Sequence, residues 1–181
     1  MTRPVARAAC ASLFALALSA CVDSSGPLLL DAKPLLGEQL RLQFYSLRKG
    51  LADEPEQATY KWDGTKYVRT GGGMTDIGGF SVHPLGRNNL IVQTAATKRP
   101  GIFEYAVARK LTDGVYQVTA IDEADADRAA RASYCRRAGE SHCRIETRGQ
   151  LFVFARATSL RKKGEGSLVL RLADGVPAPT R

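Results

Sequence analysis

Three turn signals limit the fold of this chain more than any other feature of its sequence. Asp63-Gly64, Gly86-Arg87-Asn88 and Asp113-Gly114 each separate two runs that are rich in β-branched and aromatic residues. Asp-Gly pairs and short loops containing glycine favour the tight turns of β-hairpins. The pattern therefore predicts a mostly antiparallel sheet built from hairpins. The predicted hairpins span residues 58–70, 80–95 and 102–121.

The period of the sequence changes after the third hairpin. Residues 122–135 are rich in alanine, with acidic residues first and arginines later, which suits a helix that Asp122 would cap. In residues 147–163, Thr147 and Gln150 form a capping-box pair. This pair favours a second helix, although the run LFVF within the segment also fits a strand. The helix would place these residues on one stripe: Leu151, Phe154, Ala155 and Thr158.

Single strands are expected at residues 41–46 and 167–173. Together with the hairpins and the two helices in the C-terminal half, they predict an α+β fold. Its sheet would be mostly antiparallel and built from hairpins, with a curled or barrel-like sheet as the main alternative. The helices would pack on one face of the sheet or close one end of it.

The first 21 residues have a composition of their own. Arg3 and Arg7 precede a thirteen-residue uncharged stretch that is too short to span a bilayer as a helix. The stretch ends in Leu18-Ser19-Ala20-Cys21, which resembles the lipobox of bacterial lipoproteins. The resemblance implies a diacylglyceryl group on the Cys21 sulfur, cleavage before Cys21 and acylation of the new amino terminus. An ordinary cleaved signal and an uncleaved anchor are the alternatives.

The resemblance also implies a location in the bacterial cell envelope. In such lipoproteins, Asp directly after the lipidated cysteine signals retention in the inner membrane, and this chain has Val22 there. We therefore expect an outer-membrane lipoprotein that faces the periplasm and is held there by Cys21. The expected organisation is a signal peptide at 1–20, a lipid-anchored tether at 21–38, a single domain at 39–175 and a C-terminal tail at 176–181.

Four cysteines are present, and two of them have a place in the N-terminal segment. Cys10 would leave with the signal peptide and Cys21 would carry the lipid. Cys135 and Cys143 remain as an even pair in a compartment that permits disulfides, so we predict a bridge between them. A metal site of Cys135, His142 and Cys143 is the weaker alternative, because its spacing matches no zinc motif and a fourth ligand is not evident. No metal and no cofactor are expected.

The chain is basic, with a formal charge of +8, and +6 remains once residues 1–20 with their two arginines are removed. Residues 128–163 hold ten of the cations against two acidic residues. An exported protein meets little nucleic acid, so the expected partners are anionic envelope components or another envelope protein. A generic solvated surface is the alternative. The candidate anion-binding residues are Arg136, Arg137, Arg144 and Arg148.

Catalytic motifs are not evident in the sequence. The histidines are His83 and His142, and neither lies in a metalloprotease motif or follows a serine-hydrolase elbow. The glycine-rich residues 71–79 lack the Gly-Lys-Ser/Thr of a phosphate loop and are expected to form a flexible loop. We therefore expect no catalytic residue and a non-catalytic binding or structural module. The alternative is a periplasm-facing hydrolase with an unidentified site, for instance His83 or the carboxylate pair Asp53 and Glu54.

Overall fold

The computed structural model describes residues 22–46, 55–72, 77–86, 88–137, 143–160 and 168–172. Side chains are described in these ranges except at Ser46, Arg136, Arg137 and 168–172. Several sequence predictions concern residues outside these ranges: the signal peptide, the lipid on Cys21, the carboxylates Asp53 and Glu54, His142 and the tail at 176–181.

The predicted hairpins are confirmed, and they supply most strands of the sheet, which is mainly antiparallel. The helices lie in the C-terminal half of the chain. The α+β fold class is therefore confirmed. The strands of the curled part of the sheet are β2 (Gln39–Ser46), β3 (Glu56–Trp62), β4 (Tyr67–Gly72), β5 (Gly79–Gly86), β6 (Asn89–Ala95), β7 (Phe103–Thr112), β8 (Val115–Ala120) and β11 (Leu168–Leu172).

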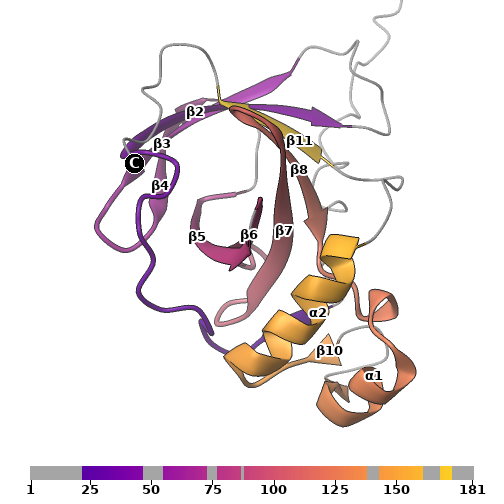
Figure 1. Cartoon of the computed structure of the whole chain (residues 1–181). Helices are drawn as coiled ribbons and strands as arrows, with labels where there is room; N and C mark the ends of the chain where they lie inside the picture. Colours follow the sequence, from indigo (N-terminus) through magenta and orange to yellow (C-terminus); the bar gives the residue numbers. More distant parts are fainter. Residues whose placement is uncertain are drawn as a thin grey trace, which may run out of the picture.

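The sheet curls strongly, and Figure 1 shows β2 to β8 and β11 wrapped around a common interior. Pairing runs from β6 through β5, β4, β3, β2, β11 and β8 to β7, and β7 pairs again with β6. The last strand, β11, lies between β2 and β8 and so joins the two ends of the hairpin series. The described residues pair β4 with β5 at only two positions, which leaves a seam there, so the sheet is curled but not closed into a barrel.

Glycines at this seam belong to strands, where a loop was predicted for residues 71–79. Gly72 ends β4 with a φ of 91°, a conformation that side chains disfavour. Gly79 begins β5, and a Cβ there would lie 2.8 Å from the carbonyl oxygen of Tyr67. The two glycines therefore permit close approach of neighbouring strands, and only residues 73–76 between them lie outside the description.

The N-terminal segment differs from the predicted tether. Val22–Ser24 form a strand, β1, which pairs with β7 on one side and with β10 (Cys143–Arg144) on the other. All three residues of β1 are at most 1% exposed, and Leu29 and Leu36 further along the segment are also buried. The packed domain therefore includes residues 22–38, because their apolar side chains and strand pairing fix them to the sheet.

The two predicted helices are present, but the first is interrupted. Asp122 caps a short 3₁₀ helix, η1 (Glu123–Asp125), and Asp127 then caps α1 (Arg128–Tyr134). Ala126, between the two helices, has an extended backbone and is 6% exposed. The helical conformation is therefore interrupted at a residue that is buried in the core. Next come β9 (Arg136–Arg137), β10 and the second helix, α2 (Arg148–Leu160).

The capping box of α2 and its buried stripe are as predicted. The side chain of Gln150 accepts from the backbone N–H of Glu146 and of Thr147, and the backbone N–H of Gln150 donates to Thr147 Oγ1. The buried residues of α2 are Leu151, Phe154, Ala155 and Thr158. The Thr158 hydroxyl donates to Asp125 in η1 over 2.9 Å, which ties the end of α2 to that turn.

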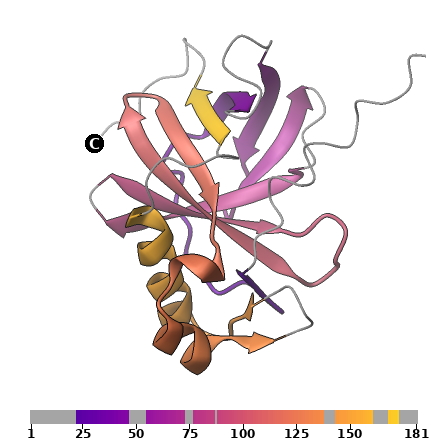
Figure 2. The ribbon, with the colours of Figure 1, turned by 90° about the vertical axis from the view of Figure 1, so that its right-hand side faces the viewer.

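Two apolar cores lie on opposite faces of the strands. Alternate residues of β7 separate them: Ala106 and Ala108 face the interior of the curl, while Tyr105 and Val107 pack with the residues of α2. The interior also holds an aromatic group in which Tyr67 stacks on Phe80 with ring centroids 5.1 Å apart. Figure 2 shows α2 against the outside of the sheet, with α1, β9 and β10 gathered at one end of the molecule.

Candidate functional site

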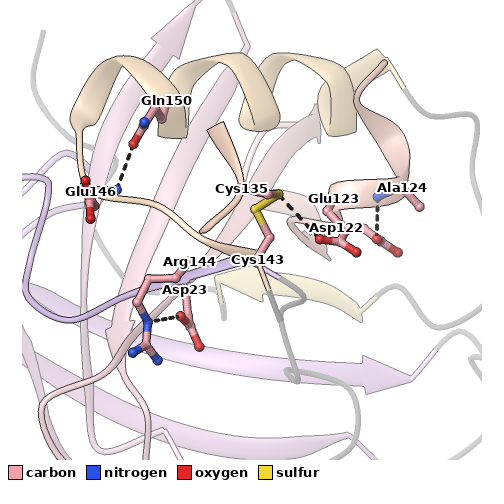
Figure 3. Close-up of a disulfide and its surroundings, with 9 residues drawn as sticks. All are labelled: Asp23, Asp122, Glu123, Ala124, Cys135, Cys143, Arg144, Glu146 and Gln150. Atoms are coloured by element: carbon pink, nitrogen blue, oxygen red, sulfur yellow. Dashed lines mark hydrogen bonds and ion pairs between the residues drawn. A yellow bond between two sulfur atoms is a disulfide. The ribbon is translucent and has the colours of Figure 1, made fainter. Parts of the chain in front are cut away.

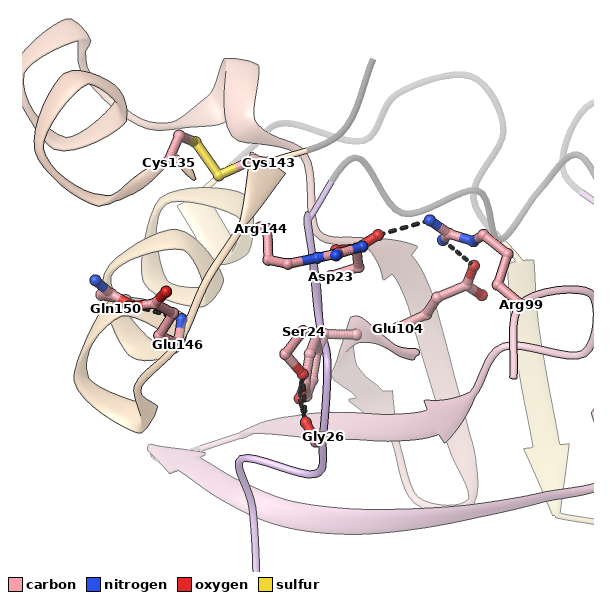
Figure 4. A network of polar contacts seen from close by, with 11 residues as sticks. Asp23, Ser24, Gly26, Arg99, Glu104, Cys135, Cys143, Arg144, Glu146 and Gln150 are labelled. Carbon is pink, nitrogen blue, oxygen red and sulfur yellow. Dashed lines mark hydrogen bonds and ion pairs between the residues drawn. A yellow bond between two sulfur atoms is a disulfide. The ribbon is translucent and has the colours of Figure 1, made fainter. Parts of the chain in front are cut away.

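The most elaborate polar site in the described residues surrounds the N-terminal strand. Asp23 Oδ2 lies 2.6 Å from Arg99 Nη1, and Asp23 Oδ1 lies 3.0 Å from Arg144 Nε. Arg99 also binds Glu104 in β7, over 2.8 Å. Figure 4 shows the two arginines approaching Asp23 from opposite sides. We call these four residues, Asp23, Arg99, Glu104 and Arg144, the Asp23 cluster.

The charges of the Asp23 cluster balance, with two carboxylates against two guanidinium groups. Asp23 and Glu104 are opposite one another in the β1–β7 pair, where two like charges would repel. Arg99 bonds both and removes that repulsion. Burial acts to lower the pKa of Arg99, but its hydrogen bonds to Glu104 and Asp23 outweigh this and raise the pKa above its ordinary value. Asp23 itself is completely buried, so its position depends on these partners.

Further hydrogen bonds fix the chain that follows β1. The Ser24 hydroxyl lies 2.6 Å from the Tyr105 hydroxyl. The side chain of Gln93 accepts from the backbone N–H groups of Leu28 and Leu29 and donates to the carbonyl of Leu29, each over 3.0 Å. A buried amide that binds three backbone groups holds the segment in one position. Residues 22–29 are therefore attached to the sheet by polar contacts as well as by apolar packing.

The disulfide predicted between Cys135 and Cys143 is present, with the two Cα atoms 4.8 Å apart. It joins the end of α1 to β10, and Cys143 pairs in register with Val22 of β1. Figure 3 shows the carboxylate of Glu123 beside the bridge, 3.5 Å from the Cys135 sulfur. Glu123, Cys135 and Cys143 thus place three metal-ligand atoms close together. Metals bind thiolates, so these sulfurs cannot act as thiolate ligands while they are bonded to one another.

The four candidate anion-binding arginines lie in three consecutive elements of the chain, β9, β10 and α2. Arg136 in β9 is opposite Arg144 in β10, Arg137 is opposite Cys143, and Arg148 begins α2. Two of them already have contacts: Arg144 binds Asp23, and the Arg148 guanidinium lies 5.2 Å from the Phe152 ring centroid. Arg144 therefore has a structural role that its sequence context did not reveal.

His83, the histidine considered for catalysis, lies in a buried polar group with Ser81. The Ser81 hydroxyl lies 3.1 Å from His83 Nε2, and both residues are 5% exposed. Burial lowers the pKa of His83, the positive charge of Arg148 lowers it further, and Asp31 acts in the opposite direction. Gln93 donates to Ser81 over 3.4 Å and also holds Leu29. The pair resembles a serine–base arrangement chemically, but it lies within the packing of the N-terminal segment.

Comparisons of the chain with protein-family models, with curated proteins and with solved structures find no match. Among the described residues, no helix has both the length and the apolar character needed to cross a membrane.

The residues that hold the N-terminal segment could not be recognised from the sequence. Asp23 and Arg144 are 121 positions apart, so no local pattern connects them. Gln93 shares one face of β6 with Ile91 and Ala95, and a polar residue between these two apolar ones was the one available signal. A polar amide at an inward position of a strand indicates a buried partner.

Proposed function

We propose that this chain is a small lipoprotein of the bacterial cell envelope, a non-catalytic binding or structural module anchored to the membrane through Cys21. The observation that carries the proposal is Leu18-Ser19-Ala20-Cys21 at the end of a short uncharged stretch. The Cys135–Cys143 bridge supports it, because such bonds persist in oxidising compartments outside the cytoplasm. The proposed location is the outer membrane, with the domain facing the periplasm.

The proposed partners are anionic, either envelope lipids and polysaccharides or an acidic envelope protein. Support comes from the excess of cations in residues 128–163. Arg128, Arg131 and Arg156 are exposed, and Arg148 is exposed at the start of α2. Because Arg144 binds Asp23, a variant designed to test the basic surface should change Arg128 and Arg131 and leave Arg144 intact.

Lipidation is tested by intact mass measurement of the protein extracted from membranes. We expect loss of residues 1–20 together with an added mass equal to that of the acyl groups. The Cys21→Ser variant should lose this added mass and leave the membrane fraction. Cys10→Ser is the matched control, because Cys10 lies in the predicted signal peptide and its change should leave the mature mass unaltered. A mature chain that begins elsewhere and dissolves without detergent would contradict the proposal.

A serine hydrolase is the second candidate, favoured by the 3.1 Å contact between Ser81 and His83. Substrate access would require displacement of Leu28 and Leu29, which Gln93 binds on the same side of the sheet. Covalent labelling of Ser81 by a serine-directed phosphonate would favour this candidate over the non-catalytic module.

A further inference from the structure

The carboxylate of Glu123 lies against the disulfide without a hydrogen-bond donor. Its Oε2 atom is 3.5 Å from the Cys135 sulfur, and a sulfur in a disulfide carries no hydrogen to donate. Among the described residues, the Glu123 side chain has no other hydrogen bond and no ion pair. Glu123 is partly buried, and a partly buried carboxylate without a donor is unfavourable. The oxidised state of the two cysteines therefore does not account for the position of Glu123.

The spacing of the same atoms suits a metal ion once the sulfurs are no longer bonded to each other. The two sulfurs and one carboxylate oxygen all lie within 4.8 Å of one another. In a tetrahedral zinc site, with Zn–S of about 2.3 Å and Zn–O of about 2.1 Å, sulfur and oxygen lie about 3.6 Å apart and two sulfurs about 3.8 Å apart. The 3.5 Å contact between Glu123 and Cys135 already has the required length. Only the two sulfurs would have to separate.

Each ligand is positioned by backbone contacts that do not involve the bridge. Glu123 lies in η1, which Asp122 caps. Cys135 ends α1, and its backbone N–H closes the last turn of that helix. Cys143 lies in β10 and pairs with Val22 of β1. Figure 3 shows the Glu123 carboxylate beside the two sulfurs. The three side chains are therefore expected to stay close together when the disulfide is open.

We propose that Glu123, Cys135 and Cys143 bind a zinc ion in the reduced protein, before the disulfide forms. Two thiolates and one carboxylate suit Zn²⁺, whereas Mg²⁺ and Ca²⁺ prefer oxygen ligands throughout. Water would take the fourth position of the tetrahedron. Cys143 is buried, while Glu123 and Cys135 are partly exposed, which gives the ion a path to the site.

Oxidation replaces the metal by the disulfide. An exported chain leaves the cytoplasm with reduced thiols, and the binding of Zn²⁺ releases the protons of both. A disulfide-bearing oxidant then takes two electrons from the thiolates. The bond between Cys135 and Cys143 forms, the disulfide of the oxidant becomes two thiols, and Zn²⁺ is released. The ion would hold η1, α1 and β10 together until the bridge does so. This order of events rests on the proposed export, whereas the metal site does not.

The first test compares metal binding by the reduced and the oxidised protein. A full chain with Cys10→Ser and Cys21→Ser has no thiols other than those of Cys135 and Cys143. It is reduced with a phosphine and titrated with Co²⁺, whose visible absorption reports tetrahedral thiolate coordination, and Zn²⁺ is then added in competition. We expect one Co²⁺ ion per reduced chain, displaced by Zn²⁺, and none per oxidised chain. No binding by the reduced chain, or equal binding by both forms, would overturn the proposal.

The second test concerns the carboxylate. Loss of an outer-shell partner already costs about 10–100-fold in metal affinity, so Glu123→Gln should weaken Zn²⁺ binding by at least about tenfold. Glu123→Asp keeps the charge and should weaken it less. Glu146→Gln is the matched control, because Glu146 is an exposed acid near Cys143 in the chain and is not among the clustered ligands. Equal affinity of the Glu123→Gln variant and the parent would overturn the three-ligand site.

A measurement without a substitution at Glu123 covers a variant that fails to fold. X-ray absorption at the zinc edge of the loaded, reduced chain should show two sulfur neighbours and lighter atoms in the remaining positions. Fewer than two sulfurs would overturn the proposal.

The last test follows release of the ion. Oxidised glutathione is added to the zinc-loaded chain, and a chromogenic chelator should record one Zn²⁺ ion released for each disulfide formed. Zinc that stays bound after the disulfide has formed would overturn the exchange. None of these measurements needs a lipid on Cys21, so absence of the acyl mass would contradict the proposed function and leave the metal site standing.

Discussion

Asp23 shows how a single residue can decide whether a segment belongs to the fold. A completely buried carboxylate is unfavourable unless it is paired, and Arg99 and Arg144 pair it from two sides. The side chains of Arg99 and Arg144 are each about a third exposed, so water partly screens both ion pairs. Water can therefore solvate the two guanidinium groups if Asp23 is replaced.

We expect Asp23→Asn to lower the free energy of unfolding by about 2–3 kcal/mol, because the amide cannot neutralise the two arginines. The estimate lies below the cost of leaving a fully buried charge unpaired, because Arg99 and Arg144 reach water. Urea denaturation of the unlipidated domain measures this change. Glu38→Gln, an exposed acid in the same segment, is the control and should shift the value by less than about 0.5 kcal/mol. A variant at Asp23 as stable as the parent would show that the cluster contributes nothing.

His83 predicts a pH dependence of stability. Its pKa is lowered in the folded protein, chiefly by burial, so the unfolded chain binds a proton more readily. The contribution of His83 to the free energy of unfolding is fully present above about pH 6.5. It decreases as the pH drops from 6.5 toward the lowered pKa, by at most about 1.4 kcal/mol per pH unit. Arg148 opposes protonation and Asp31 favours it, while Ser81 bonds the ring.

We expect His83→Gln to reduce the loss of unfolding free energy between pH 7 and pH 5, relative to the parent, in denaturation series at matched ionic strength. If the profile of the His83 variant matches that of the parent, His83 is not the group responsible.

Among the elements, the short strands depend most on the disulfide. β9 and β10 have two residues each, and strands of that length have little stability of their own. The bridge closes a loop with a sequence separation of eight. The chain-entropy model assigns about 2–3 kcal/mol to a loop of this size.

We expect the double variant Cys135→Ala and Cys143→Ala to lose about 2–3 kcal/mol of unfolding free energy and to remain folded. Hydrogen exchange should become faster in β9, β10 and β1, and β2 to β8 should keep their protection, because the interior core does not contact the bridge. Faster exchange throughout the sheet would show instead that the bridge supports the whole domain.

The same elements show where sequence reasoning succeeds. The hairpins and α2 were predictable because their signals are local: turn residues between alternating runs, and a capping box before a 3.6-residue stripe. β1 was not predictable, because three residues carry no period and Asp23 is a polar residue in a buried strand. The break at Ala126 was not predicted either. Two aspartates in one acidic run, Asp122 and Asp127, can each cap a helix, and in the folded protein both do so, on either side of the buried Ala126.

For the whole molecule, the sequence predicted the fold class and gave a curled sheet only as an alternative. Nothing in the local pattern places β11 between β2 and β8, or returns β7 to β6, since these pairings depend on the curl of the complete sheet. The polar contacts of the candidate site also depend on the complete fold. The disulfide was predictable from the even cysteine pair, whereas the Asp23 cluster brings together residues from three separate parts of the chain.

The double pairing of β1 has a mechanical consequence. A force applied at residue 21 acts along a strand that is hydrogen-bonded on both edges, so the load falls on several bonds in shear at once. The ion pairs of Asp23 and the hydrogen bond from the Ile145 N–H to the Asp23 carbonyl share that load within two residues of the place where the force is applied. A chain pulled from this end would resist until β1 breaks from both neighbours together, whereas a flexible leader would simply extend.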